Sequence, residues 1–344
     1  MDEDGTIHEA WGTIALRLRK PDGAGPCEQR IEETPVPTAI TRVAAGGVSL
    51  EQTAYRAPIW PGGIDVLTAR LENAGGAPAD VLLDVLLPES ASIGEWMVTA
   101  GGHPAVALPA GADPKREERA WGCTGGVVSL PGWGKPEGVC DPGFSNIRAG
   151  MGGVPIVYRF AVPPGATRTV VLGFCESHWD TPGQRPVAIR VEGAPGAEVD
   201  PLAQWGRHQP GCMRFDAADS NRDGRLELAI DPHPEAADKN TILNCVWVFA
   251  PETSVVPAEV VTGRMTSAAE YYVDVGGEKD QGLYVGGTVP YPLHLEPGAV
   301  RELTFLLASP GGGPVPHPGT TTWTPASLRK AAEDVWRGSA NGSR

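Results

Sequence analysis

Short apolar runs separated by turn-forming residues dominate the chain. Gly63–Asn73 reads GIDVLTARLEN and Ala79–Leu87 reads ADVLLDVLL, and each run stops at a turn or a proline. Runs of this length predict strands. Further strands are expected at Ile156–Val162, Arg168–Cys175, Val187–Glu192, Leu226–Ile230, Leu243–Phe249, Tyr271–Val275, Leu283–Val285 and Arg301–Ala308. Because no helical pattern lies between these runs, the chain is predicted to be all-β, with two packed or interleaved antiparallel, jelly-roll-like β-sandwiches.

Two segments share one design. VPPGATRTVVLGF (162–174) and LEPGAVRELTFLL (295–307) each carry Pro-Gly-Ala, then a basic residue, then a strand. The similarity is compatible with a weak internal repeat, but we favour the same hairpin chemistry used twice.

One C-terminal helix is predicted, over 323–337. Thr324 can cap it, and Pro325 suits its first turn. The residues expected to share its apolar face are Leu328, Ala331, Ala332 and Val335. The tail, 338–344, is expected to be disordered.

Composition limits the classes of function. The chain has 344 residues, and 28 Lys+Arg against 42 Asp+Glu give a net charge of −14. This charge argues against a nucleic-acid or anionic-membrane surface and suits neutral sugars better than polyanions. No apolar run is long enough to span a membrane. The glycines and prolines, 45 and 34, favour short strands joined by turns.

Cysteine usage and the N-terminus leave the cellular compartment open. None of the six cysteines lies in a CxxC or has zinc spacing, and their pairing cannot be deduced. The first residues, MDEDGTIHEAW, contain no signal-peptide pattern. The protein is therefore extracellular or periplasmic if an export signal was removed, and otherwise cytoplasmic. The oligomeric state is not predicted.

The sequence DSNRDGRLEL resembles an oxygen-rich calcium loop. Alternate side chains of a tight turn point inward, and a glycine permits the sharp bend. The EF-hand glutamate at the twelfth position is missing, because Ile230 stands there. We predict a structural Ca²⁺ site between strands; the alternative is an Asx-type turn without an ion. The predicted ligands are Asp219, Asn221, Asp223, the carbonyl of Arg225, and Glu227.

The segment GFCESHWDTPGQRP (173–186) is an apolar strand ending in a polar, aromatic loop. If the strand continues, Glu176, His178 and Asp180 lie on one side of it. We interpret them as hydrogen-bond partners of a ligand; an acid/base group is the alternative.

Ten tryptophans form the third candidate feature. Trp60, Trp133, Trp179 and Trp205 stand beside Pro, Gly or polar residues, which is typical of loops. A flat, exposed indole can stack on the C–H face of a sugar ring, although loop anchoring is also possible. The chain has no P-loop, dinucleotide fingerprint, GxSxG elbow or HExxH.

The middle of the chain, about 152–250, resembles malectin and malectin-like domains. These domains share a strand ending in Phe-x-Glu, a loop with Pro-Gly-x-Arg, and a strand ending in Asn-Gly or Glu-Gly. The resemblance implies a jelly-roll sandwich that binds carbohydrate through aromatic and polar loop residues. The Tyr-rich sugar site of malectin has no counterpart here. The matching residues are Phe174, Glu176, Pro182, Gly183, Arg185 and Gly193, with Asn240 and Asn244 further along.

The flanking segments resemble something else. Residues 47–88 and 293–312 resemble the β-supersandwich that precedes the helical barrel of six-hairpin glycosidases, and 327–337 resembles the helix leading into that barrel. The resemblance implies a non-catalytic sandwich portion, because the barrel with its carboxylates is missing.

The predicted organisation is one sandwich from 1–150 plus 251–312 and a malectin-like sandwich from 151–250. The predicted function is carbohydrate binding by an accessory module, with an oligo- or polysaccharide partner. The rival hypotheses are a glycoside hydrolase or polysaccharide lyase, acting through pairs such as Glu176 with Asp180 or Asp141 with Glu118, and a scaffold without a ligand. The predicted ligand-binding residues are Glu176, His178, Trp179, Asp180, Arg185, Trp133 and Trp205.

Overall fold

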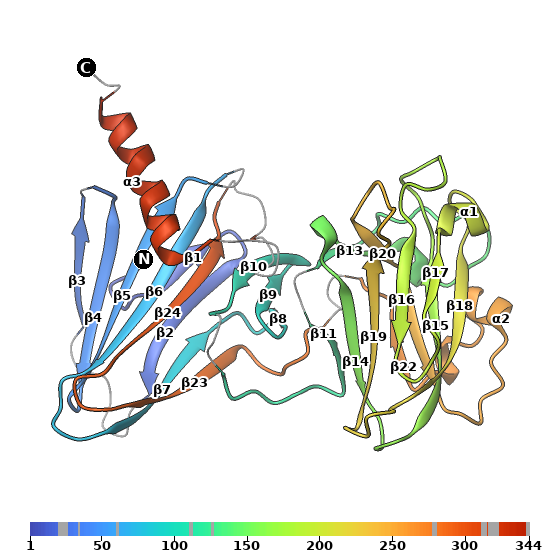
Figure 1. Ribbon diagram of the computed structural model, residues 1–344, viewed down its shortest axis with the longest axis horizontal. Helices are drawn as coiled ribbons and strands as arrows, with labels where there is room; N and C mark the ends of the chain where they lie inside the picture. Colours follow the sequence, from blue (N-terminus) through green and yellow to red (C-terminus); the bar gives the residue numbers. More distant parts are fainter. Residues whose placement is uncertain are drawn as a thin grey trace.

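The chain forms two β-sandwiches, seen as separate lobes in the computed structural model (Figure 1). This arrangement confirms the predicted all-β class with two antiparallel sandwiches and a C-terminal helix. The structure describes residues 1–19, 27–33, 35–59, 62–109, 113–124, 127–276, 281–310, 315 and 323–341. Trp60, most of the loop 309–322 and residues 342–344 lie outside this description.

The first sandwich packs a four-stranded sheet against an eight-stranded sheet. The smaller sheet has the order β1 (Ile7–Glu9), β2 (Gly12–Arg19), β7 (Ala79–Leu86) and β23 (Thr288–Leu295). The larger sheet has the order β3 (Cys27–Glu32), β4 (Thr38–Ala45), β5 (Val48–Ala57), β6 (Ile64–Asn73), β24 (Val300–Ala308), β10 (His103–Ala107), β9 (Met97–Ala100) and β8 (Ser92–Ile93).

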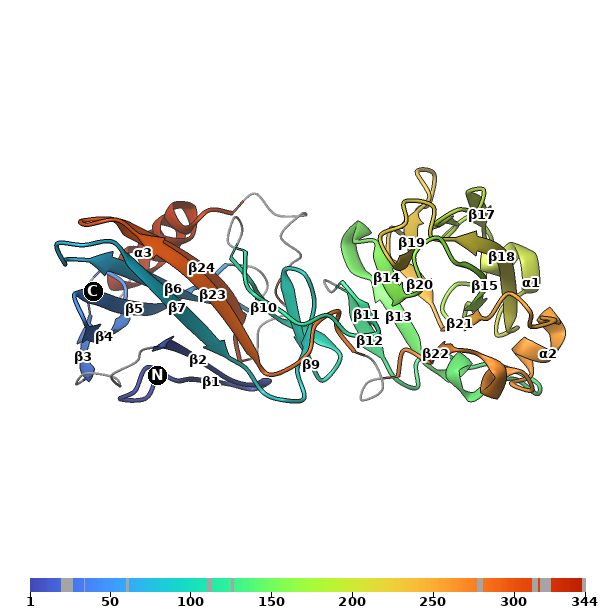
Figure 2. The same ribbon diagram turned by 90° about the horizontal axis from the view of Figure 1, so that it is seen from below.

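Alternating side chains build the core between these two sheets. Leu16 of β2, Leu50 of β5 and Phe305 of β24 are nearly or fully buried in one cluster, because every second residue of a strand faces the same side. Tyr291 of β23 meets Phe305 edge to face across the core. The late strands β23 and β24 thus lie among strands from the start of the chain (Figure 2).

The C-terminal helix α3 (Pro325–Asn341) covers the outer face of the eight-stranded sheet. Leu328 and Ala332 are buried against Tyr55 of β5 and Val66 of β6. The helix continues past the predicted end at 337, so residues 338–341, expected to be disordered, are helical. None of the described helices is long and apolar enough to cross a membrane.

The second sandwich is built from three antiparallel sheets around its own core. The first sheet has the order β11 (Trp121–Cys123), β14 (Ile156–Ala161), β19 (Arg225–Pro232), β16 (Val187–Val191) and β17 (Ala197–Val199). The facing sheet has the order β18 (Gly211–Ala218), β15 (Thr167–Phe174), β21 (Cys245–Phe249) and β22 (Tyr271–Val273). The third has the order β12 (Val128–Leu130), β13 (Ile147–Gly150) and β20 (Thr241–Leu243).

Short helical turns complete the second sandwich and were not predicted. They are α1 (Pro201–Trp205), α2 (Pro257–Val261) and three 3₁₀ turns, η1 (Pro142–Ser145), η2 (Met151–Gly153) and η3 (Thr266–Ala268). Asp200 caps α1 by accepting hydrogen bonds from the N–H groups of Leu202 and Ala203.

Strand pairing assigns 121–150 to the second sandwich, although the sequence placed the boundary at residue 150. β11 pairs with β14, and β13 pairs with β20. On the other side, β22 pairs with β21, so the second sandwich extends beyond 250. The outgoing and returning connections run side by side, joined by backbone hydrogen bonds such as Arg119 N–H to Leu283 O (2.9 Å) and Val285 N–H to Glu117 O (2.8 Å).

The two Pro-Gly-Ala segments share a turn that is not a hairpin. Ala166 donates to Pro163 O and Ala299 donates to Glu296 O, each at 2.9 Å. The intervening glycine has a φ of 78° in the first turn and 72° in the second, as a type II turn requires. The strands that flank each turn belong to facing sheets, so each turn carries the chain across a sandwich.

Two predicted strands differ from the structure. The run Leu243–Phe249 is divided at Asn244 into β20 and β21. The buried side-chain amide of Asn244 donates to Phe144 O and Asn146 O and accepts from Cys175 N–H. Leu283–Val285 forms only isolated bridges, through Tyr284. All six cysteines are free.

Candidate functional site

A buried ionic cluster lies below the loops at one end of the second sandwich. Arg185 bonds Glu176 Oε2 at 2.8 Å and Asp238 Oδ2 at 2.6 Å. The other oxygen of Glu176 accepts the backbone N–H groups of His178 (2.7 Å) and Trp179 (3.1 Å). One guanidinium therefore bridges two carboxylates and fixes the loop that follows β15.

This cluster changes the role expected for Glu176. The strand ends at Phe174, so the expected alternation of Glu176, His178 and Asp180 along one face does not form. Glu176 is only 2% exposed and both of its oxygens are occupied, so it holds the loop rather than facing a ligand. His178 and Asp180 are exposed beyond it.

Trp179 is held in a fixed orientation at the surface. Its indole Nε1 donates to Asp238 Oδ2 at 2.9 Å, and the His178 ring meets it edge to face at 4.7 Å. Burial opposes the ionisation of Asp238, but the N–H of Asn240, the indole and the Arg185 guanidinium outweigh it and lower the pKa of Asp238. The sequence did not single out Asp238, because an isolated loop aspartate gives no periodic signal.

The other two predicted tryptophans flank this loop. Trp133 is 55% exposed, and its loop is tied to the Trp179 loop by a hydrogen bond from Lys135 N–H to Ser177 Oγ (3.0 Å). Trp205 is half-buried and stacks on Phe174 at 6.2 Å, so it anchors α1 more than it offers a free face. We call the surface of Trp133, His178, Trp179 and Asp180 the loop-end surface.

The predicted calcium loop closes on itself through hydrogen bonds. Asp219 Oδ2 accepts from Gly165 N–H (3.0 Å) and Gly224 N–H (2.9 Å), and its Oδ1 accepts from Asp223 N–H (3.2 Å). Burial opposes the ionisation of Asp219, but these backbone donors lower its pKa. The side chain of Asn221 bonds that of Asp223 at 3.2 Å.

The side-chain oxygens of this loop accept hydrogen bonds from its own backbone N–H groups, which is the pattern of an Asx-type turn. Within the described part of the chain, no three His, Cys, Asp or Glu side chains are grouped so as to hold a metal ion. The side chain of Glu227 pairs with Arg159, and the guanidinium of Arg225, whose carbonyl was the predicted ligand, pairs with Glu118. The loop has the geometry of the Asx-type alternative, and the calcium site stays an untested prediction.

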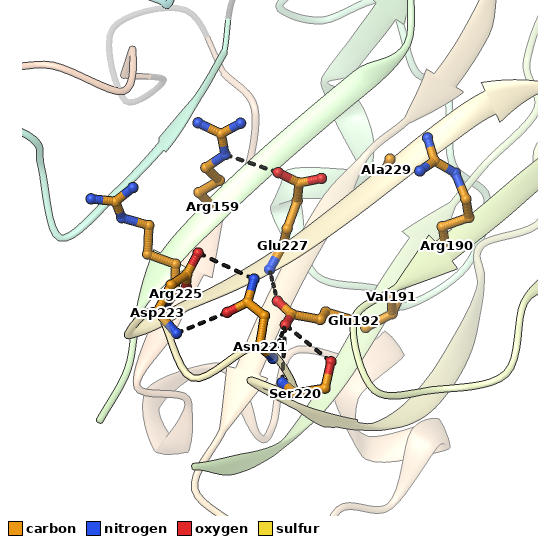
Figure 3. A pocket seen from close by; sticks show the side chains of 10 residues that line it. All are labelled: Arg159, Arg190, Val191, Glu192, Ser220, Asn221, Asp223, Arg225, Glu227 and Ala229. Carbon is orange, nitrogen blue, oxygen red and sulfur yellow. Dashed lines mark hydrogen bonds and ion pairs between the residues drawn. The ribbon is translucent and has the colours of Figure 1, made fainter. Parts of the chain in front are cut away.

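Next to this turn, a groove of about 530 Å³ lies on the outer face of the β14–β19–β16 sheet (Figure 3). Its lining comes from three strands and the 219–224 turn. No sequence pattern points to this groove beyond the turn itself, since Arg159, Arg190 and Arg225 lie on segments that are distant in the chain. The lining residues are Arg159, Arg190, Val191, Glu192, Ser220, Asn221, Asp223, Arg225, Glu227 and Ala229.

The acid pairs proposed for catalysis are not brought together. Asp141 is buried against the outer side of the β18–β15–β21–β22 sheet, where it accepts hydrogen bonds from Tyr272 and Thr266 (2.6 Å). Glu118 pairs with Arg225 over the opposite sheet. In the other pair, Glu176 is buried with Arg185 while Asp180 is exposed.

The fold and these surfaces define a two-sandwich β-protein with a tryptophan-bearing loop end and a polar groove. No protein-family model matches the chain, and no curated protein does. Solved structures with some likeness include the ANXUR2 extracellular domain from Arabidopsis thaliana, with 12% identity, a TM-score of 0.32, and coverage of 72% of this chain and 94% of that chain. The plant receptor-like kinase FER gives 12% identity, a TM-score of 0.31 and the same two coverages.

A third such structure is the complex of the plant peptide RALF23 with FER and LLG2, with 12% identity, a TM-score of 0.31, and coverage of 67% of this chain and 89% of that chain. At these values the likeness is one of fold and weak, and it carries no conclusion about function. The malectin-like and glycosidase-like resemblances stay predictions.

Proposed function

We propose that the protein binds carbohydrate and that the loop-end surface is the binding site. The observation that supports this most directly is the fixed indole of Trp179, hydrogen-bonded to Asp238 and placed on a loop tied to that of the exposed Trp133. An aromatic face that is ordered before binding loses little conformational entropy when a sugar ring stacks on it.

The residues of this surface divide into two roles. Trp133 and Trp179 offer apolar faces for stacking, and the exposed His178 and Asp180 supply hydrogen bonds to sugar hydroxyls. Glu176 and Arg185 act as positioning residues, because their contacts fix the backbone between 176 and 179. The predicted set, apart from Trp205, thus keeps a part in binding, and Trp205 anchors α1 against Phe174.

The test is a glycan-array and polysaccharide-gel screen of the full chain, followed by titration of the best neutral glycan against Trp133→Ala and Trp179→Ala. We expect each variant to lose at least about tenfold in affinity, which corresponds to about 1.4 kcal/mol. Trp336→Ala is the matched control, because Trp336 is 40% exposed on α3 of the other sandwich.

Two outcomes would contradict the proposal: wild-type affinity in both variants, or no glycan retained by the intact chain. Trp133→Ala guards against a folding artefact, since no described side-chain hydrogen bond of Trp133 would be lost. Assaying released reducing sugar in the same wells separates binding from hydrolysis, because a glycoside hydrolase would release it.

A further inference from the structure

The groove on the second sandwich is hollow because a small residue lies between long ones. Ala229 is in the middle of β19, where the strand register places Val157 on one side and Arg190 on the other. One row further along, Arg159 lies opposite Glu227. The side chains of Arg159, Arg190 and Glu227 stand around the alanine, and Figure 3 shows them rising from neighbouring strands.

The positive charges in and around the groove are matched by carboxylates. Arg159 pairs with Glu227 at 2.9 Å, and Arg190 pairs with Asp231 at 2.9 Å. Arg225 pairs with Glu118. Because each of the three guanidiniums already has a partner, an anionic ligand would have to displace a carboxylate, and the site does not favour a polyanion.

Hydrogen-bonding capacity nevertheless remains. A guanidinium has five N–H donors and a carboxylate has about four acceptor positions, so a single pair leaves donors and acceptors free side by side. Arg190 keeps 65% of its side chain exposed and Glu227 keeps 42%. Adjacent donors and acceptors suit a vicinal diol, since each hydroxyl both donates and accepts.

The turn beside the groove is already rigid. Glu192 Oε1 accepts from Ser220 N–H at 2.9 Å, and Glu192 Oε2 accepts from Glu227 N–H at 3.3 Å. Asp219 fixes the other side of the turn by accepting from Gly165 N–H and Gly224 N–H. The turn that lines the groove therefore loses little conformational freedom when a ligand binds. The lining contains no aromatic side chain, so recognition here depends on hydrogen bonds and not on stacking.

We propose that this groove is a second binding site, for a neutral, hydroxyl-rich ligand of the size of a short oligosaccharide. Its volume falls in the range of small-ligand sites, about 300–1,000 Å³. The proposal rests on the proposed carbohydrate binding only for the class of ligand. The groove is formed by strands of one sheet face, whereas the loop-end surface is formed by the loops at one end of the sandwich.

The experiment uses the full chain carrying Trp133→Ala and Trp179→Ala, so that loop-end binding is weakened. Cello-, xylo- and malto-oligosaccharides serve as neutral probes and oligogalacturonate as the anionic probe, in calorimetric titrations. We expect one of the neutral probes to bind, and we expect Arg190→Gln to lower its affinity at least about fivefold. Arg42→Gln is the matched control, because Arg42 is an exposed strand arginine paired with Glu51 on the first sandwich.

A charge variant sharpens the test. Glu227→Gln keeps the shape but leaves Arg159 without its close carboxylate, since Glu95 is 3.9 Å away. We expect Glu227→Gln to bind oligogalacturonate, with an affinity that falls as the salt concentration is raised. The same chain with Glu227 in place should not bind this anionic probe.

Three results would overturn the groove proposal. In the first, the neutral probe binds the unsubstituted chain, Arg190→Gln does not change its affinity there, and the double tryptophan variant does not bind it. This result would assign all binding to the loop-end surface. The second is binding of oligogalacturonate alone at the groove. The third is no binding of any probe, while a glycan still binds the intact chain through the tryptophans.

Discussion

Each sandwich holds two carboxylates around one arginine, with opposite results. In the second sandwich, Arg185 lies within 2.8 Å of Glu176 and 2.6 Å of Asp238. In the first, Arg56 is 3.7 Å from Asp65, and Glu9 Oε2 is buried without a partner among the described residues. Where the guanidinium contacts both carboxylates, as in the second sandwich, the cluster stabilises a loop. Where it lies further away, as in the first sandwich, the two carboxylates repel each other.

The titration of the two clusters follows from this geometry. Burial, and after it the negative charge of Asp65, raises the pKa of Glu9 to about 8. In the other cluster, Asp238 has a lowered pKa despite its burial. The first cluster thus joins β1 to β6 most firmly when Glu9 holds a proton, and the second fixes the loop-end surface when Asp238 is ionised.

The largest effect is expected from removing the bridging arginine. Arg185→Ala leaves Glu176, at 2% exposure, as a buried charge without its cation, and should lower the free energy of unfolding by about 3–5 kcal/mol. Urea denaturation followed by circular dichroism measures this change.

The matched control for that variant is Arg42→Gln. It removes an exposed ion pair with Glu51 and should cost under about 1 kcal/mol. Equal effects of the two substitutions would show that the Glu176–Arg185–Asp238 cluster contributes no more to the free energy of unfolding than an exposed ion pair does.

A smaller effect is expected from pH at the first cluster. The folded protein holds the Glu9 proton more tightly than the unfolded chain, whose glutamate has a pKa near 4.5. The stability this contributes is fully present below about pH 4.5 and is lost as pH rises through about 8. Glu9→Gln, which cannot ionise, should therefore show a weaker fall in melting temperature between pH 5 and pH 9.

The comparison for this experiment is Glu51→Gln, on β5 of the facing eight-stranded sheet, which removes a glutamate carboxylate paired with the exposed Arg42. Its pH profile should follow that of the unchanged chain. A Glu9→Gln profile that also follows the unchanged chain would mean that Glu9 is ionised in the folded protein near neutral pH.

The smallest effect is expected from calcium at the 219–224 turn. There a third carboxylate, Asp219, is compensated by backbone N–H groups rather than by an arginine. We expect the melting temperatures in EDTA and in millimolar CaCl₂ to agree within about 1 °C. A clear rise in calcium would support the ion site predicted from the sequence.

The sequence predicts single elements better than the contacts between them. β6 and β7 match their predicted runs almost to the residue, because alternation is a local pattern. The shared Pro-Gly turns are also local, yet the sequence does not reveal that β14 and β15, joined by one such turn, belong to different sheets. Partner choice depends on the whole set of strands.

The residues behind the malectin-like resemblance illustrate the same limit at the candidate site. Glu176 and Arg185 form one ion pair, and Asn244 satisfies three backbone groups. These residues hold the backbone of the loop in place. The malectin-like pattern therefore locates the loop but does not indicate which side chains contact a ligand. Asp238, which completes the cluster, belongs to no recognisable pattern, and the groove is assembled from separate segments.

The position of β24 has a consequence for synthesis on the ribosome. This strand lies between β6 and β10 in the eight-stranded sheet, although both partners are made long before it. Until β24 emerges, β6 and β10 each present an unpaired edge, while the strands of the second sandwich have already been made. A nascent chain at that stage would be vulnerable to intermolecular pairing, so the yield of folded protein should depend on how soon β24 follows the second sandwich out of the ribosome.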